Sequence, residues 1–491
     1  MTLVRCGLGS GRELKTPRGT NRPRGVRHAV PVALAALAVA CIPYRPVPLD
    51  PPALGAAFSA RRLDEPGLVH FLAARGVATA DSGWRPRDLG LVAVYFHPVL
   101  DEARATLAVA RAAEITAGGR PQPDASVGAE LASAAPAGES AWTASLAAGV
   151  TLETGGKRQA RIARARAATL SASLRLRAAS WTVAFAADSA SVVAVAADTD
   201  AAEARAESEA LVGLVALLRA RYAEGSVALA DVAQVEAQLQ ASVVTRVESD
   251  KARAAARGAL AGALALPLDE TRTLAIQSPA SPGCTLPDTL DSRRFLALAL
   301  NRRDDLGAAL ADYAITEADV RIEVTRQRPD VHLGPGLAWD QGVVRWTLGV
   351  AFPAVMVNGN RGPIAEAEAR RAAAAVRFEI AQQRVIREAA VAQLQCSGEE
   401  NQLAATDSLV QGTEKGLQVA QAAYDRGETG AVEVAFARVA RIRAARARNA
   451  ARRDVTLASL ALEQALGRWL SGPALEAGAI EHSPRTSEGR P

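Results

Sequence analysis

The sequence predicts a mainly α-helical protein with a small β part, built from two internal repeats of a β-hairpin plus a long antiparallel helix hairpin. Three observations support this fold class. Long stretches without proline are rich in Ala, Arg and Leu; short stretches alternate apolar and polar residues; and both patterns occur twice in one order. Ala is the best helix former, and only 4% of the 491 residues are aromatic, which favours closely packed helices over a large globular core.

The N-terminus is predicted to be a secretory signal peptide covering residues 1–40. Arginines precede an apolar run, Ala29–Ala40, which is too short to span a bilayer as a helix. The run ends in Ala38-Val39-Ala40, which suits ordinary signal cleavage. The next residue, Cys41, also fits a lipoprotein signal, in which this cysteine would be lipidated. The sequence is compatible with both alternatives.

Three further segments lie outside the repeats. Residues 41–90 are predicted to be a Pro-rich N-terminal tail, and the prolines from 42 to 52 favour a polyproline-like conformation. Residues 271–290 are predicted to link the repeats, and residues 473–491 to form a disordered C-terminal tail.

The first repeat is predicted at residues 91–270. It begins with a helix and a hairpin, whose second strand alternates apolar and polar residues from Trp142 to Leu152. A long helix, a tip and a returning helix follow, and Pro267 stops the last of these. The expected elements are 99–117, about 124–153 for the hairpin, 159–222, 223–231 for the tip, and 229–266.

The second repeat is predicted at residues 291–472, with the same elements in the same order. Tyr222 and Tyr424 lie 202 residues apart, and so do Gly225 and Gly427. A helix of about 60 residues would be about 90 Å long, so these helices must lie against one another as coiled-coil-like pairs. The expected elements are a helix at 293–327, a hairpin at about 330–353, a helix to 424, a tip at 425–433, and a helix to about 470.

The two hairpins supply only four strands, which would leave two open edges in a single sheet. Strands with one apolar and one polar face suit a membrane-spanning barrel, which must close on itself. Four strands are too few to close, so the sequence predicts an oligomer. The competing interpretation is an exported all-α protein with two incidental hairpins.

Charge and motifs exclude several other classes of protein. The net charge of +5 comes from the seven basic residues in 1–40, so we expect no nucleic-acid binding. The five histidines are scattered, and no nucleophile motif or phosphate-binding loop occurs; we therefore expect no metal site, no cofactor and no enzyme activity. Of the four cysteines, only Cys284 and Cys396 could pair in an exported chain, and we expect no functional role for either.

The duplicated order of hairpin, long helix, Tyr-x-x-Gly tip and long helix resembles the TolC family of outer-membrane efflux proteins. The stretch from Arg328-Pro329-Asp330 to Ala367 carries the resemblance best, and the match covers roughly residues 90–472. It most resembles the heavy-metal cation efflux branch. The resemblance implies a homotrimer whose twelve strands form one barrel in outer-membrane lipid and whose helices form a periplasmic α-barrel.

The resemblance also implies a function. Such a trimer is a passive conduit of a tripartite efflux system, which works with a periplasmic adaptor (membrane fusion protein) and an inner-membrane RND-type pump to export metal cations or small toxic molecules. Two alternatives remain: an outlet for type I protein secretion, and a periplasmic coiled-coil scaffold without a pore.

Residues at the two tips carry over position by position. Glu433 and Tyr424 match an aperture acid and its neighbouring tyrosine, and Asp231 and Tyr222 are their counterparts in the first repeat. Three copies of each acid near a narrowing would bind cations. The alternative is that both are exposed acids stabilised by the N-terminal end of a helix.

The second tip also departs from the family pattern. Phe436 replaces a second acid and suggests an apolar constriction, and Thr429 stands where a base is expected, which leaves the ionic part of the gate incomplete. Gly225 and Gly427 suit tight turns, because glycine accepts a positive φ. With Ser226 and Glu428 they are predicted to dock the adaptor.

Overall fold

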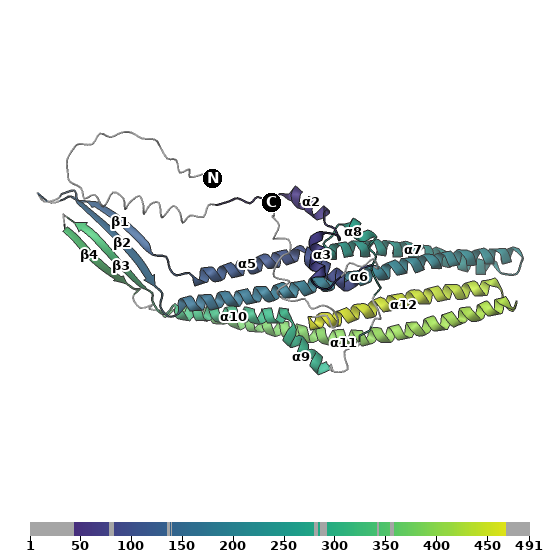
Figure 1. Cartoon of the computed structure of the whole chain (residues 1–491). Coiled ribbons are helices and arrows are strands. Elements are labelled where there is room, and N and C mark those ends of the chain that lie inside the picture. The colour runs from purple at the N-terminus through teal and green to yellow at the C-terminus, as the bar shows by residue number, and fades with distance from the viewer. Residues whose placement is uncertain are drawn as a thin grey trace, which may run out of the picture. The chain divides into compact units, whose positions relative to one another are not determined.

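Figure 1 shows a computed structural model of the chain. It describes residues 44–77, 83–134, 138, 140–278, 283–284, 292–340, 343–353 and 358–467. The predicted signal peptide at 1–40, Cys41 and the predicted tail at 473–491 lie outside the described residues. The chain divides into two compact units, Met1–Ala56 and Ala57–Pro491, and the candidate site lies wholly in the second unit.

The range expected to be a Pro-rich tail contains helices. Residues 44–50 have no regular secondary structure, but helix α2 runs from Pro51 to Ser59, so the expectation of a polyproline-like conformation up to Pro52 is wrong. Proline is tolerated in the first turn of a helix, where its missing N–H would have no partner. Asp50 Oδ1 accepts a hydrogen bond from Ala53 N at 3.2 Å and so helps to start this helix.

Three more helices begin at a proline: α3 (Pro66–Ala73), α4 (Pro86–Phe96) and α5 (Pro98–Gly118). Helix α4 is buried almost throughout and packs against α6. Its close approach to α6 requires Gly90, because a Cβ there would lie 2.6 Å from Asp188 Oδ1. The sequence shows no periodic signal for α4, since its side chains are apolar on nearly all sides.

Two long hairpins make up most of the helical part. The first consists of α6 (Lys157–Ala223) and α7 (Leu229–Leu264), and the second of α11 (Arg361–Asp425) and α12 (Ala431–Leu466). At 67 residues, α6 is about 100 Å long. Helix α7 ends where Ala265 takes a positive φ of 51°, two residues before Pro267.

The helix expected at 293–327 is two helices, α9 (Ser292–Arg302) and α10 (Asp304–Thr325). Arg303 between them has an extended backbone, with φ −72° and ψ 120°. Two acids open α10, where the helix dipole favours negative charge. The Arg303 guanidinium forms ion pairs with Asp305 at 2.7 Å and with Glu388 of α11 at 2.5 Å. These contacts hold the break in place.

The strands form one antiparallel sheet in the order β1-β2-β3-β4. Their bounds are β1 Asp124–Leu131, β2 Trp142–Leu152, β3 Val331–Asp340 and β4 Val343–Ala351. The sheet joins the two repeats, because β2 of the first pairs with β3 of the second. Strands β1 and β4 stand at its open edges.

The helices pack side by side in two rows that share α6 and α11. Near the tips the order is α7–α6–α12–α11, and towards the sheet it is α5–α6–α10–α11 (Figure 1). Helix α6 is long and apolar enough to cross a membrane, but half of its most apolar stretch is buried inside the protein. This burial is what a core helix shows, so α6 gives little reason to expect a spanning helix.

Candidate functional site at the helix tips

The first tip is a tight turn between α6 and α7. Gly225 has a φ of +76°, which favours glycine. Its N–H donates to Tyr222 O at 2.9 Å, and both the N–H and the hydroxyl of Ser226 donate to Arg221 O at 3.0 Å. These bonds satisfy the last carbonyls of α6 and fix the turn.

The second tip repeats this geometry. Gly427 has a φ of +75°, its N–H donates to Tyr424 O at 2.9 Å, and Glu428 N donates to Ala423 O at 2.9 Å. Arg426 forms a two-bonded ion pair with Glu428, at 2.7 and 2.9 Å. The hydrogen bond from Arg426 lowers the pKa of Glu428.

The side chains predicted to line an aperture all lie at the surface of the protomer. Tyr222, Tyr424 and Phe436 are 45%, 46% and 44% exposed, and Asp231 and Glu433 are exposed in the first turns of α7 and α12. No hydrogen bond or ion pair joins any two of these five described residues. A single protomer therefore exposes these five side chains at its surface without joining them by hydrogen bonds or ion pairs.

Glu433 has a partner that sequence reasoning missed. Arg221, at the end of α6, reaches across to the second hairpin, and its Nη1 lies 4.0 Å from Glu433 Oε1. Gly430 makes room for it, because a Cβ at that position would overlap the guanidinium. A base is thus present at the second tip, but the first repeat supplies it in place of position 429.

An apolar cluster behind the tips holds the two hairpins together. It combines valines near the start of α7 and α12 with three leucines and one valine near the end of α6, and all of them are buried. Its buried members are Leu211, Leu214, Val215, Leu218, Val232, Val235, Val432 and Val439. The two turns are therefore supported by a closely packed apolar cluster.

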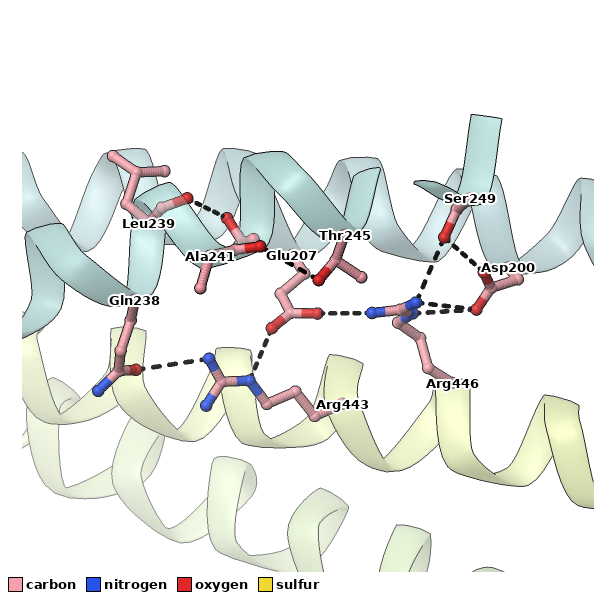
Figure 2. Close-up of polar contacts among 10 residues, drawn as sticks. Asp200, Glu207, Gln238, Leu239, Ala241, Thr245, Ser249, Arg443 and Arg446 are labelled. Carbon is pink, nitrogen blue, oxygen red and sulfur yellow. Dashed lines mark hydrogen bonds and ion pairs between the residues drawn. The ribbon is translucent and has the colours of Figure 1, made fainter. Parts of the chain in front are cut away.

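Further from the tips, α12 meets α6 and α7 through polar groups, which we call the junction: Asp200, Glu207, Ser249, Arg443 and Arg446 (Figure 2). Glu207 is only 6% exposed, and Arg443 Nε and Arg446 Nη1 donate to its two oxygens at 2.7 and 3.1 Å. Arg446 also contacts Asp200 Oδ1 at 3.0 Å, and Ser249 Oγ donates to Asp200 Oδ2 at 2.6 Å. A buried carboxylate paired in this way keeps its charge satisfied.

Cys284 and Cys396, which could pair according to the sequence, form a disulfide with Cα atoms 5.7 Å apart. Cys396 lies on α11 in an apolar cluster with residues of α9 and α12, among them Phe295 and Leu462. Cys284 N also donates to Glu400 Oε1 at 2.8 Å. The bond ties the segment between the repeats to the second hairpin, so both cysteines have a structural role.

The comparisons agree with this architecture. The sequence model of the outer membrane efflux protein family matches residues 295–468. VceC, an outer membrane protein from Vibrio cholerae, is 21% identical with a TM-score of 0.63, covering 79% of this chain and 97% of its own. The outer-membrane channel OprN is 19% identical with a TM-score of 0.66, covering 87% and 99%. CmeC, an outer membrane channel from Campylobacter jejuni, is 16% identical with a TM-score of 0.64, covering 87% and 93%. No curated protein matches the sequence.

The duplicated hairpins, the joint sheet and the glycine tips define the chain as a TolC-like channel-tunnel protomer. The fold is shared along most of the chain, and the family's sequence pattern covers most of the second repeat. Residues 295–468 match the sequence model of the outer membrane efflux protein family, and the fold of most of the chain is that of solved outer-membrane channels.

Proposed function

We propose that three copies of the chain form a passive outer-membrane channel of a tripartite efflux system, which exports metal cations or small toxic molecules without catalysing a reaction. One observation carries the proposal. The sheet and both helix rows are each left open at two edges, and at every level the first repeat forms one edge and the second repeat the other. Edges of this kind join head to tail, and a head-to-tail contact that closes gives a ring.

The outer edge of α7 carries an unpartnered heptad pattern, which we call the α7 seam. Its residues alternate in steps of three and four, are mostly small, and are all exposed: Ala230, Ala233, Ala237, Gln240, Val244, Val247, Lys251, Ala254 and Gly258. Such spacing is typical of a helix that supercoils with a neighbour.

The outer edge of α11 carries a matching pattern, the α11 seam: Val391, Leu394, Gly398, Asn401, Ala405, Ser408, Gly412, Lys415 and Val419, all exposed. Added Cβ atoms at Gly398 and Gly412 would meet nothing within 4 Å. Helix α7 runs away from the tips and α11 towards them. The α7 seam of one copy can therefore meet the α11 seam of the next as an antiparallel pair, with backbones close together.

The sheet supports a membrane location for the other end of the channel. Alternate apolar residues of β4 are strongly exposed, with Trp346 at 83% and Leu348 at 71%. Lipid would cover such a face once twelve strands close into a barrel. The exposed turns at Gly225-Ser226 and Gly427-Glu428 are the surfaces proposed to receive a periplasmic adaptor, which in turn binds an RND-type pump.

Reconstitution tests the channel directly. We expect SDS-resistant trimers in the outer-membrane fraction and stepwise ion conductance when they are added to planar bilayers. A monomer without conductance would refute the channel and leave the scaffold alternative. Export of a protein substrate, and not of metal cations or dyes, would favour the type I secretion alternative.

At the tips, we propose that Arg221 and Glu433 restrain the closed aperture, with Asp231, Tyr222, Tyr424 and Phe436 lining it. Arg221→Ala should raise the open fraction of the channel by about 1.4- to fivefold, because a part-exposed ion pair contributes about 0.2–1 kcal/mol. Single-channel recording at low salt measures this rise, which should shrink at high salt.

The matched control for the tip is Arg219→Ala. Arg219 pairs with Glu236 of the same hairpin at 2.6 Å, so its loss breaks no contact between hairpins. An equal rise in both variants would show that the contact across the tips has no special part in gating.

A further inference from the structure

The two cysteines of the disulfide lie in unequal surroundings. Cys396 is 2% exposed and belongs to the apolar cluster formed by α9, α11 and α12, whose buried members include Phe295, Ala299 and Leu462. Cys284 packs against this cluster but is only partly buried. One cysteine is therefore covered by packed side chains, whereas the other keeps some contact with solvent.

Cys284 contacts both helices of the second hairpin. Its N–H donates to Glu400 Oε1 on α11 at 2.8 Å, and its Sγ lies 4.0 Å from Val455 O on α12. Helix α9, which starts at Ser292, follows Cys284 in the chain and packs against both helices of this hairpin. Joining the two cysteines therefore brings α9 close to the surface that it covers.

The cover over Cys396 limits its chemistry. A protein disulfide forms by exchange, in which a thiolate attacks one sulfur of an existing disulfide and passes through a mixed disulfide. Apolar surroundings disfavour a thiolate, so a buried cysteine is unreactive. In the complete cluster, Cys396 would have to ionise among aliphatic and aromatic side chains. Exchange at Cys396 is therefore slow once α9 has packed, whereas Cys284 is less hindered.

We propose that Cys284 is the entry point for thiol–disulfide exchange, and that a disulfide-bearing oxidant protein joins it to Cys396 before α9 packs. In the first step, the Cys284 thiolate attacks the oxidant's disulfide; a mixed disulfide forms, and one oxidant thiolate leaves. In the second step, the Cys396 thiolate attacks Cys284 Sγ, and the other oxidant thiolate leaves. The oxidant thereby gains two electrons, and its two thiolates take up the two protons that the cysteines lose.

This order gives the chain a partner during folding, namely a thiol oxidoreductase with a reactive disulfide. The two cysteines are 112 positions apart and enclose α9, α10, β3 and β4. The oxidant must therefore act after these segments have reached its compartment and before the cluster is complete. The reactivity of the two sulfurs does not depend on the chain forming a channel.

Single-cysteine forms of the full-length protein test the assignment. Cys396→Ala leaves the thiol of Cys284, and Cys284→Ser leaves that of Cys396; both forms also carry Cys6→Ser and Cys41→Ser. In the folded protein, Cys284 should react with DTNB, a small aromatic disulfide, at least about tenfold faster than Cys396. In guanidinium the two rates should be equal. Equal rates in the folded protein, or a faster Cys396, would overturn the proposal.

Phe295→Ala tests whether α9 is the cover. Phe295 is 1% exposed in the same cluster as Cys396, so its truncation in the Cys284→Ser form should speed the reaction of Cys396 about threefold or more. The matched control is Phe71→Ala, which truncates a buried phenylalanine in a different cluster and should leave that rate unchanged. If both variants sped the reaction equally, general loosening would account for it, and α9 would not be the cover.

The wild type supplies a measurement that needs no substitution. At one pH and one dithiothreitol concentration, the disulfide of the folded protein should be reduced at least about tenfold more slowly than that of the chain in guanidinium. Attack on Cys284 must expel the Cys396 thiolate into the apolar cluster, which disfavours it. Labelling of the released thiols with a maleimide of high mass, followed by electrophoresis, gives both rates. Equal rates would show that Cys396 is not shielded.

Discussion

The double variant Cys284→Ser, Cys396→Ala should unfold at a clearly lower denaturant concentration than the wild type. The disulfide joins residues 112 positions apart, and a cross-link over a loop of this length stabilises a fold by about 4–5 kcal/mol in the chain-entropy model. Cys396 is 2% exposed, and alanine fits its position without adding volume. The change can be followed by guanidinium unfolding monitored by circular dichroism.

Reductant provides the matched control for this variant. Dithiothreitol should lower the unfolding midpoint of the wild type towards that of the double variant and should leave the variant unchanged. If the oxidised wild type and the double variant had equal midpoints, the disulfide would contribute no stability. A reductant effect on the variant itself would point to the other cysteines.

Gly412→Leu should abolish the trimer while leaving the protomer folded. Gly412 lies in the α11 seam, and a Cβ there meets no atom of the same chain within 4 Å. Leucine is a better helix former than glycine by up to about 1 kcal/mol, so the isolated helix gains stability. In the proposed assembly the larger side chain keeps the α7 seam of the next copy at a distance. Size-exclusion chromatography with light scattering gives the mass, and circular dichroism gives the helix content.

Gly213→Leu is the control for the seam. Gly213 is also an exposed helical glycine with open space around it, but it lies on α6, inside the row and away from both seams. It should remain a trimer. A trimeric Gly412→Leu protein would place the contact between copies elsewhere, and a monomeric Gly213→Leu protein would make the disruption non-specific.

The sequence predicts the fold well because the same order of strands, helices and tips occurs twice in the chain, so each repeat supports the interpretation of the other. Tyr222 and Tyr424 mark the tips, and the alternation in β2 and β4 marks the strands. Patterns of this kind depend on local spacing, which the sequence displays directly. Helix α4 is not predicted, because it is buried on nearly all sides and so shows no alternation of apolar and polar residues. The break at Arg303 is not predicted either, because contacts with residues distant in the sequence stabilise it.

The candidate site was only partly predictable for the same reason. Gly225, Gly427 and the acids of the first turns follow from turn geometry and the helix dipole. The pairing of Arg221 with Glu433 and of Glu207 with Arg443 joins residues more than 200 positions apart, and an arginine in an Arg-rich helix gives no sign of which acid it meets. Only the packing of α6 against α12 selects these partners.

In the proposed trimer, the two repeats of one chain would be joined differently from two neighbouring chains. Within a chain, the hairpins meet through the charged junction as well as the apolar cluster behind the tips, whereas between chains they would meet through seams of mostly small side chains without a charged cluster of that kind. A closed ring of six hairpins would then be only quasi-equivalent, with two kinds of joint in alternation. Ionic strength and acidity act on charged contacts and barely on apolar ones. Such a ring would therefore respond to them at every second joint, and its aperture would widen with threefold symmetry.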